Sequence, residues 1–305
     1  MRRALKRASF AAFFALDRLG LHVLPKHYYT PVPDFDWLRR NRDAWTQPAG
    51  LADVHWDVDQ QLHWMRRVCE PYYAEVAGLQ FYERLLAGDV GPGYGPIESQ
   101  VLHCFIRTFA PARVVEIGSG ASTACMLKAS SLNAAQGRRE SRITCVEPFP
   151  RAAFRSVGNV IHVEQLCQTV PEVVFLQLQT GDLLFVDSSH AVRTGSDVIR
   201  IYLDIIPKLP AGVYVHIHDI NLPYAYARDA LGGYFASQET ALLLALLTGS
   251  ERLRILSCLS ALHYRFPVEL QRLLTDYQPQ ADHPGTGLSA TERGHFPSSA
   301  WLETG

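Results

Sequence analysis

Residues 112–123 contain the feature that most constrains the fold, a run of β-branched residues that ends at two closely spaced glycines. The run predicts a buried strand over 113–117, and the residues after the glycines predict a helix over 122–133. Glycine at such a turn lets the backbone approach a ligand closely, because a Cβ would clash there. This order of strand, turn and helix is typical of an α/β nucleotide-binding site. The residues that we expect to form this part of a cofactor site are Glu116, Gly118, Ser119, Gly120 and Ser122.

The glycine turn does not by itself identify the ligand. A dinucleotide-binding fingerprint has a third glycine three residues after the second, where this chain has Thr123. An NAD-linked oxidoreductase is therefore the weaker interpretation. Glu116, near the end of the strand, can bind a cation or a hydroxyl group of the ligand. A tight turn that binds no ligand stays an alternative, as does a non-catalytic protein that binds a nucleoside.

The composition is that of an ordinary globular protein, with 48% hydrophobic and 19% charged residues among 305. A net charge of −1 gives no general attraction to nucleic acid, so we expect no nucleic-acid partner. None of the six cysteines forms a Cys-x-x-Cys pair. They are best explained as reduced thiols in the core of a cytoplasmic protein.

The N-terminus combines a basic start, Met1-Arg2-Arg3, with an apolar run over residues 8–16. The run is interrupted by Asp17-Arg18 and is too short to span a bilayer, so no transmembrane segment is expected. We predict an amphipathic helix over 4–19 that packs on the body of the protein or on a second subunit, which allows a homo-oligomer. Attachment to a membrane surface is the alternative.

Strands and helices alternate from residue 112 onward. This alternation predicts an α/β fold, a Rossmann-like, doubly wound, mostly parallel sheet of seven strands with an N-terminal helical extension. We place a catalytic domain at 94–305 and a helical and extended cap region at 1–93. The expected strands are 113–117, 142–146, 159–163, 183–186, 213–217, 254–260 and 299–302. The expected helices, besides that at 4–19, are 58–87, 97–109, 122–133, 195–207 and 236–248.

The ends of the next strands supply residues for a nucleoside. Glu147 follows the strand 142–146, and a carboxylate there can accept hydrogen bonds from both ribose hydroxyls. Gln165 and Leu166 follow the strand 159–163 and can flank an adenine ring. The glycine–proline loop that contains Tyr94 precedes the first strand and can fold over the cofactor.

Polar side chains also end the fourth and fifth strands. Asp187 and His190 follow the strand 183–186, and His218 and Asp219 end the next one. Neighbouring parallel strands lie about 4.8 Å apart, so these four residues can converge on one point. Two carboxylates with one or two imidazoles can hold a divalent cation. Carboxylates suit Mg²⁺ or Mn²⁺, whereas imidazole favours Fe, Zn or Ni.

With these motifs, residues 94–302 resemble the class I methyltransferases that use S-adenosylmethionine (SAM). The arrangement of Asp187, His190 and Asp219 is similar to metal-dependent O-methyltransferases that act on sugars of macrolides and related natural products. In that family the strand-4 aspartate and an acidic pair after strand 5 hold Mg²⁺, and the histidine is the proposed general base. This chain has His218 in place of the first acidic residue, which points to a softer metal or to none.

The resemblance implies a SAM-dependent methyl transfer, most simply to oxygen of a small polar natural product or a saccharide. His190, with an ordinary pKa of about 6.5, would accept the hydroxyl proton near neutral pH. A divalent metal (Mg, Mn or Fe) at Asp187 and Asp219, with His190 and His218 as further ligands, would lower the pKa of that hydroxyl.

Overall fold

The computed structural model describes the chain from Arg2 to Gly305 except residues 79, 88–89, 92, 153–158, 228–229, 232–236, 275 and 281–293, with side chains from Arg7 onward apart from that of Gln80. Contacts divide the chain into two compact units, Met1–Trp45 and Thr46–Gly305. The division lies upstream of the boundary between residues 93 and 94 that we predicted from the sequence.

The first unit is helical and extended. It consists of helix α1 (Arg2–Asp17), the short helix α2 (Phe35–Arg40) and the 3₁₀ turn η1 (Arg42–Ala44). The proline-rich segment before α2 contains a turn in which the Thr30 N–H donates to the His27 carbonyl at 2.9 Å. The Asp34 carboxylate caps α2 by accepting the backbone N–H groups of Asp36 and Trp37. The predicted N-terminal helix is therefore present, two residues earlier than expected. None of residues 7–45 is buried.

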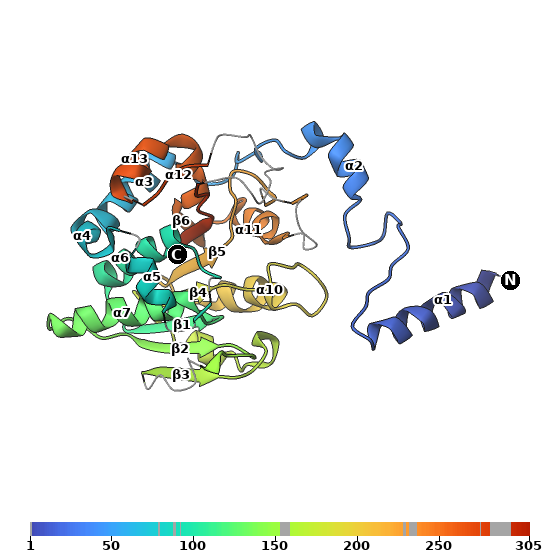
Figure 1. Ribbon diagram of the computed structural model, residues 1–305, viewed down its shortest axis with the longest axis horizontal. Coiled ribbons are helices and arrows are strands. Elements are labelled where there is room, and N and C mark those ends of the chain that lie inside the picture. Colours follow the sequence, from blue (N-terminus) through green and yellow to red (C-terminus); the bar gives the residue numbers. More distant parts are fainter. Residues whose placement is uncertain are drawn as a thin grey trace. The chain divides into compact units, whose positions relative to one another are not determined.

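The second unit is built on a seven-stranded sheet with the order β3-β2-β1-β4-β5-β7-β6 (Figure 1). Strands β1 to β5 pair in parallel, and β7 is antiparallel to both β5 and β6. This confirms the predicted Rossmann-like, doubly wound, mostly parallel sheet. The strands are β1 (Arg113–Ile117), β2 (Arg142–Val146), β3 (Val160–Val163), β4 (Leu183–Val186), β5 (Tyr214–His218), β6 (Leu253–Cys258) and β7 (Ser299–Thr304).

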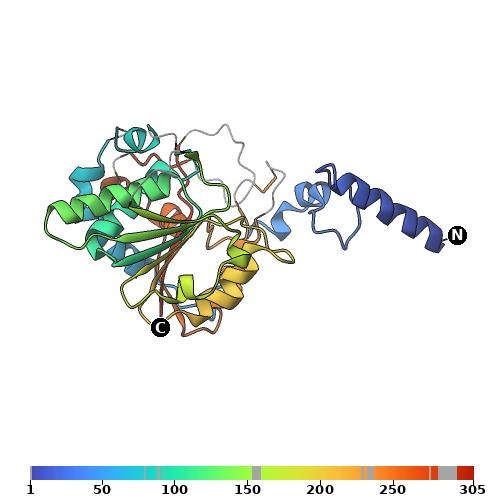
Figure 2. The same cartoon turned by 90° about the horizontal axis from the view of Figure 1, so that it is seen from below.

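Helices cover both faces of this sheet, and Figure 2 shows the green helix α7 on one side and the yellow α10 on the other. Side chains alternate along each strand, so Val114 packs in one core and Val115 in the other. The first face carries α3 (Val58–Cys69), α6 (Pro96–Phe109), α7 (Ala121–Ala135), α12 (Leu259–Arg265) and α13 (Pro267–Leu273). The second carries η3 (Cys167–Thr169), α9 (Val173–Leu176), α10 (Asp197–Arg200) with its continuations η4 (Ile201–Ile205) and η5 (Ile206–Lys208), and α11 (Glu239–Leu247).

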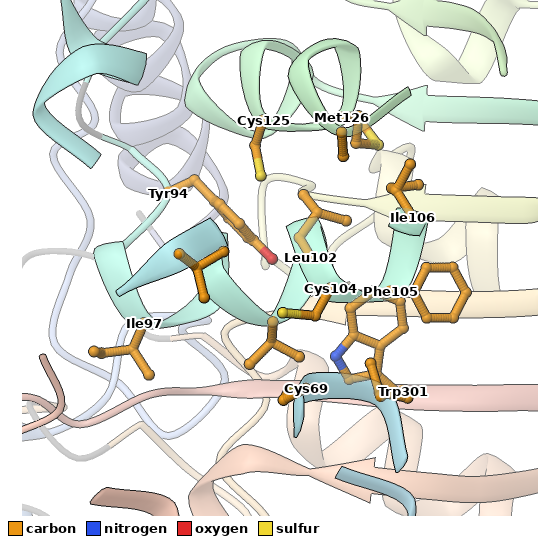
Figure 3. Close-up of a cluster of buried hydrophobic side chains, with 14 of the residues drawn as sticks. Cys69, Tyr94, Ile97, Leu102, Cys104, Phe105, Ile106, Cys125, Met126 and Trp301 are labelled. Carbon is orange, nitrogen blue, oxygen red and sulfur yellow. The ribbon is translucent and has the colours of Figure 1, made fainter. Parts of the chain in front are cut away.

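The core of the first face explains why α3 belongs to the second unit. Trp64 of α3 packs against Trp301 of β7 with ring centroids 5.9 Å apart, and Trp301 stacks on Phe105 of α6 at 4.3 Å. Figure 3 shows the rings of Phe105 and Trp301 beside Cys69 and Cys104 in one apolar cluster. Residues that we predicted to form part of a separate cap therefore share the core of the sheet.

The helix predicted over 58–87 is broken into shorter pieces. After α3 the chain forms η2 (Glu70–Tyr72), α4 (Tyr73–Val76) and α5 (Gln80–Leu86). Pro71 has no N–H to donate and its ring clashes with the preceding turn, so the helix cannot continue regularly through it. Gly78, with a φ of +99°, then turns the chain before α5.

The six cysteines are all free and buried, as the sequence indicates. Within the described part of the chain, no helix combines the length and the apolar character that crossing a membrane requires.

Candidate active site

The carboxyl ends of β1, β2 and β4 lie side by side. Ile117 pairs with Val146 and with Val186 at the last positions of the three strands. The hydrogen bonding continues one residue further, because Gly118 donates its N–H to the Val146 carbonyl and Asp187 donates its N–H to the Ile117 carbonyl, both at 3.0 Å. Gly118 and Asp187 are thereby held at one edge of the sheet, where ligands of open α/β sheets bind.

Gly118 occupies a position that only glycine fits. Its φ is +109°, and a Cβ added there would lie 3.0 Å from the Asp187 carbonyl oxygen. The next glycine, Gly120, donates its N–H to the Thr123 hydroxyl at 3.0 Å and so starts helix α7. Ser119 lies half-buried between them. The turn places backbone, with no side chain at Gly118, next to Asp187.

We expect Gly118→Ala to destabilise the protein and to weaken its binding of S-adenosylhomocysteine. The left-handed φ alone costs about 1–2 kcal/mol for a residue with a Cβ, and the contact with Asp187 adds a shift of the backbone at the ligand edge. Gly137→Ala is the matched control, because Gly137 has a φ of +70° and nothing within 4 Å of an added Cβ. Urea unfolding and calorimetric titration of both variants measure the difference. Equal losses in both would show that the close approach to Asp187 is unimportant.

Glu116 lies under the turn. It is fully buried, and its carboxylate accepts hydrogen bonds from the hydroxyls of Ser122 and Thr123 and from the Cys145 thiol. We expected Glu116 and Ser122 to offer their side chains to the ligand. Instead these side chains bond to each other, because Glu116 shares a face of β1 with Val114 and therefore points to α7. Glu116 anchors the helix that the glycine turn introduces.

Burial raises the pKa of Glu116 to about 7, although the three donors oppose this. The folded protein thus favours the protonated carboxyl. The contribution of this group to the free energy of unfolding is fully present below the ordinary pKa of 4.5 and decreases as the pH rises to 7. The decrease is at most about 3 kcal/mol.

Glu116→Gln is therefore expected to gain stability relative to the wild type as the pH rises. Glutamine keeps the shape and an acceptor oxygen but carries no charge. Urea unfolding at about pH 5 and about pH 8 should show the variant closer to, or above, the wild type at the higher pH. A difference that does not change with pH would contradict a buried, titrating carboxyl.

The nucleoside side of the site lies at β2 and β3. Glu147 is half-buried, and its Oε1 accepts the N–H of Phe149 at 2.8 Å. Gln165 and Leu166 are exposed after β3, the neighbour of β2. Phe149, two residues after Glu147, has an aromatic ring that is 82% exposed. Sequence reasoning did not select this residue. These four side chains remain available to a ribose and an adenine ring.

Tyr94 lies beneath the site rather than on its surface. It is buried in the apolar cluster of Figure 3. Its ring lies 4.9 Å from that of His218, and its hydroxyl lies 3.2 Å from Nε2 of His216. Burial lowers the pKa of His216 well below its ordinary value, so this imidazole is neutral. The Tyr94 side chain supports the strands that carry the site, and its contact with a cofactor stays a prediction.

His190 is the centre of the polar cluster. Its Nε2 lies 3.6 Å from Oδ1 of Asp187 and 3.5 Å from Oδ2 of Asp219. Its Nδ1 lies 2.7 Å from Oε2 of Glu239, the first residue of α11. The structure thus brings together Asp187, His190 and Asp219 as the topology predicts. His218 is connected to this group through Asp219, because its Nε2 lies 3.6 Å from Oδ1 of Asp219.

Glu239 is a member of the cluster that sequence reasoning missed. It is fully buried, and besides His190 it binds the Ser188 hydroxyl, which donates to both carboxylate oxygens at 3.0 and 3.1 Å. The backbone N–H of His190 in turn donates to the Ser188 hydroxyl at 3.2 Å. His190 itself has a φ of +56°, so the loop is held in a left-handed conformation by these contacts.

The carboxylates determine the charge of His190. Burial disfavours its protonation, but Asp187, Glu239 and Asp219 outweigh burial and raise its pKa to about 11. We expected an imidazole with an ordinary pKa. In this structure the ring carries its proton at neutral pH, and it fills the position between Asp187 and Asp219.

A second buried carboxyl, Glu98 of α6, lies below the cluster and was also missed. Its Oε1 accepts the backbone N–H of Ser298 at 3.0 Å, and the Ser298 hydroxyl donates to Oδ1 of Asp219 at 2.9 Å. Burial raises the pKa of Glu98. For His218, burial opposes protonation, but Asp219, Asp187 and Glu98 outweigh it and raise its pKa. The base of the site is thus a network of polar groups that neutralise each other.

This donor set does not fit the divalent metal that the resemblance implied. Among the residues that the structure describes, no group of three or more His, Cys, Asp or Glu side chains is arranged to hold a metal ion. Nε2 of His190 already lies between the two carboxylates, and Asp219 also accepts a hydrogen bond from the Ser298 hydroxyl.

A family model described as a methyltransferase domain matches residues 115–220, from β1 to the residue after Asp219. The match covers the glycine turn, Glu147 and the His190 cluster. The match covers about a third of the 305 residues, and it lies on the strands of a Rossmann-like sheet. Residues 115–220 are therefore similar to a methyltransferase domain.

Solved structures of methyltransferases are also similar. The Podospora anserina methyltransferase PaMTH1, with S-adenosylhomocysteine bound, is 17% identical over 74% of this chain and 92% of its own, with a TM-score of 0.37. The Burkholderia thailandensis 1,6-didemethyltoxoflavin-N1-methyltransferase, with 1,6-didemethyltoxoflavin and S-adenosylhomocysteine bound, is 13% identical over 84% and 93%, with a TM-score of 0.41. A search of curated proteins gives no significant match.

Proposed function

We propose that this protein is a SAM-dependent methyltransferase that methylates a hydroxyl oxygen of a small polar acceptor, a natural product or a saccharide. One observation carries the proposal: His190 Nε2 lies between two half-exposed carboxylates, Asp187 and Asp219, at the edge of the sheet beside Gly118. A hydroxyl placed there meets acceptors for its proton. The same carboxylates can accept hydrogen bonds from neighbouring hydroxyls, which a saccharide supplies.

In the reaction, the acceptor oxygen attacks the methyl carbon of SAM in line with the leaving sulfur. The new O–CH₃ bond forms as the S–CH₃ bond breaks. The electron pair of the S–CH₃ bond stays on sulfur, which thereby loses its positive charge. The hydroxyl proton passes to Nε2 of His190. In the free enzyme this nitrogen carries a proton, which must first be lost to solvent water before the ring can accept another. The arriving sulfonium cation favours that loss, because a nearby positive charge lowers the pKa of an imidazole. His190 thereby serves as the general base only in the SAM complex.

Glu239 orients this base in the proposed mechanism. Its buried carboxylate holds the Nδ1 side of the ring, so the other nitrogen faces the acceptor. We expect Glu239→Gln to lower kcat about 10- to 100-fold, a loss within the range for general base catalysis, and to leave the affinity for S-adenosylhomocysteine unchanged. Glu172→Gln is the control, because the exposed Glu172 carboxylate forms an ion pair with Lys208. If Glu239→Gln impairs S-adenosylhomocysteine binding and kcat equally, Glu239 shapes the pocket rather than the base.

The proposed function is tested with SAM that carries an isotopic methyl group. Purified enzyme is incubated with panels of glycosides, phenols, amines and small proteins, and the methylated atom is located by NMR. Label on a hydroxyl oxygen of a glycoside or a phenol supports the proposal. Label found only on nitrogen, carbon or protein overturns it. A rise in melting temperature with S-adenosylhomocysteine but not with NAD(H) checks the cofactor independently.

A further inference from the structure

The first unit, Met1–Trp45, combines two features that the catalytic site does not use. The first is exposed apolar surface. None of residues 7–45 is buried, and six large apolar side chains between Phe10 and Leu24 are 38% to 75% exposed. We call them the N-terminal apolar patch: Phe10, Phe14, Leu19, Leu21, Val23 and Leu24. Such a concentration of exposed apolar side chains marks an interaction surface.

The second feature is charge. Residues 2–24 contain five arginines and lysines and a single carboxylate, Asp17, in a chain whose net charge is −1. Four of the basic residues lie in the first two turns of α1, and Arg18 follows its end. Asp17 is engaged by His22 at 2.7 Å. The apolar patch thus lies on a strongly basic stretch of chain.

We propose that the N-terminal apolar patch and its basic residues dock this enzyme on an anionic lipid surface. A helix that joins phenylalanine and leucine with lysine and arginine can insert its apolar side chains at the headgroup boundary, while the basic ones bind lipid phosphates. Two such signals together, an apolar one and a basic one, are what stable attachment to a membrane surface takes. Tyr28 and Tyr29, which are 82% and 81% exposed just after the patch, are residues that membrane interfaces favour.

The charge decides between a membrane and a second copy of the chain. A two-fold interface would place the same patch on both subunits. Five basic residues would then face five, and repulsion would oppose the apolar contact. Anionic lipid supplies the opposite charge together with an apolar interior.

The test is co-sedimentation of the full chain with phosphatidylcholine vesicles, with and without phosphatidylglycerol. We expect binding only to the anionic vesicles, and we expect it to fall steeply between about 0.1 M and about 1 M NaCl, as the Debye length shrinks from about 10 Å to about 3 Å. Equal binding to both vesicles, or binding to neither, overturns the proposal.

Two variants locate the surface. Removing three charges should weaken anionic binding at least about tenfold, and removing two phenylalanines should do the same. The variants are Arg3→Gln with Lys6→Gln and Arg7→Gln, and Phe10→Ser with Phe14→Ser. The matched controls lie on exposed positions of the second unit: Lys128→Gln with Arg139→Gln and Arg272→Gln, and Val173→Ser with Val268→Ser.

Three outcomes would overturn the proposal. If the controls weaken binding as much as the N-terminal variants, the surface is elsewhere. If light scattering shows that the wild type is a dimer and that the Phe10 and Phe14 variant is a monomer, a second copy of the chain covers the patch. If the Phe10 and Phe14 substitutions lower the melting temperature of the second unit, whose own sequence is unchanged, and the wild type binds no vesicles, the patch packs on the enzyme itself. Methyl transfer in the absence of vesicles should stay unchanged in the variants.

Discussion

Asp187→Ala is expected to lower turnover by about 1000-fold, the middle to upper range for loss of a proton-transfer group, while the affinity for S-adenosylhomocysteine changes only a few-fold. Asp187 reaches His190 with its carboxylate, whereas its contact with the glycine turn is made by its backbone. Alanine keeps that backbone. The substitution therefore removes a partner of the base and leaves the turn that holds the cofactor.

Steady-state kinetics and calorimetric titration separate the two effects. A fall in kcat with unchanged binding corresponds to an interaction made in the transition state. Asp204→Ala is the control, since Asp204 makes only a loose contact of 3.9 Å with Arg200 on the second face. Near-normal turnover of Asp187→Ala would remove Asp187 from the mechanism. Loss of S-adenosylhomocysteine binding in parallel with kcat would instead make Asp187 a cofactor ligand.

The pattern of the sequence predicts most of the sheet and the gathering of Asp187, His190 and Asp219. Each strand is a local run of β-branched or apolar residues, and parallel strands necessarily bring their carboxyl ends to one edge. These features depend on neighbours in the sequence or on topology alone. The positions of the residues that follow each strand are therefore fixed once the strand order is known.

The partners of those residues depend on distant parts of the chain. Glu239 follows His190 by 49 residues, and it meets His190 because the start of α11 lies against the loop after β4, where the Gln238 N–H donates to the His190 carbonyl at 3.2 Å. No local pattern marks it, although a carboxylate that opens a helix after a long loop is a recognisable candidate. The same limit applies to the charge of His190, because three carboxylates from separate segments raise its pKa.

Glu116 shows a different kind of error. Its acidic side chain beside the glycine turn indicates a ligand contact, yet alternation along the strand already places it with Val114 on the face covered by α7. The start of the folded unit at Thr46 depends on long-range packing of α3 and on a buried ionic network, neither of which leaves a periodic signal.

That network gives the largest stability effect that we expect. Arg107, near the end of α6, is 1% exposed, and its guanidinium donates to both oxygens of Glu75 at 2.8 and 3.0 Å. It also donates to Asn133 of α7 and to Gln136 and lies over the Tyr72 ring at 4.8 Å. One side chain therefore joins η2 and α4, which we had assigned to the cap, to the helices on either side of β1.

Arg107→Ala should lower the free energy of unfolding by about 3–5 kcal/mol, because it leaves a partly buried Glu75 carboxylate without its ion-pair partner. For a unit of this size the melting temperature should fall by roughly 10 °C. Burial would raise the pKa of Glu75, but its bonds to Arg107 and His103 outweigh burial and lower it, which shows that the carboxylate depends on these partners.

The double variant Glu75→Leu with Arg107→Met distinguishes an ion pair from mere packing. Replacing both charges by apolar groups of similar volume should recover much of the loss, since neither charge is then left alone. Arg272→Ala, on the exposed side of α13, should change stability by less than about 0.5 kcal/mol.

The network lies where α6 leads into the amino end of β1, opposite the edge that carries His190. Arg107→Ala should thus keep the kcat of the folded enzyme at low temperature. A loss of kcat without a loss of stability would show that residues 70–76 shape the acceptor site as well as the fold.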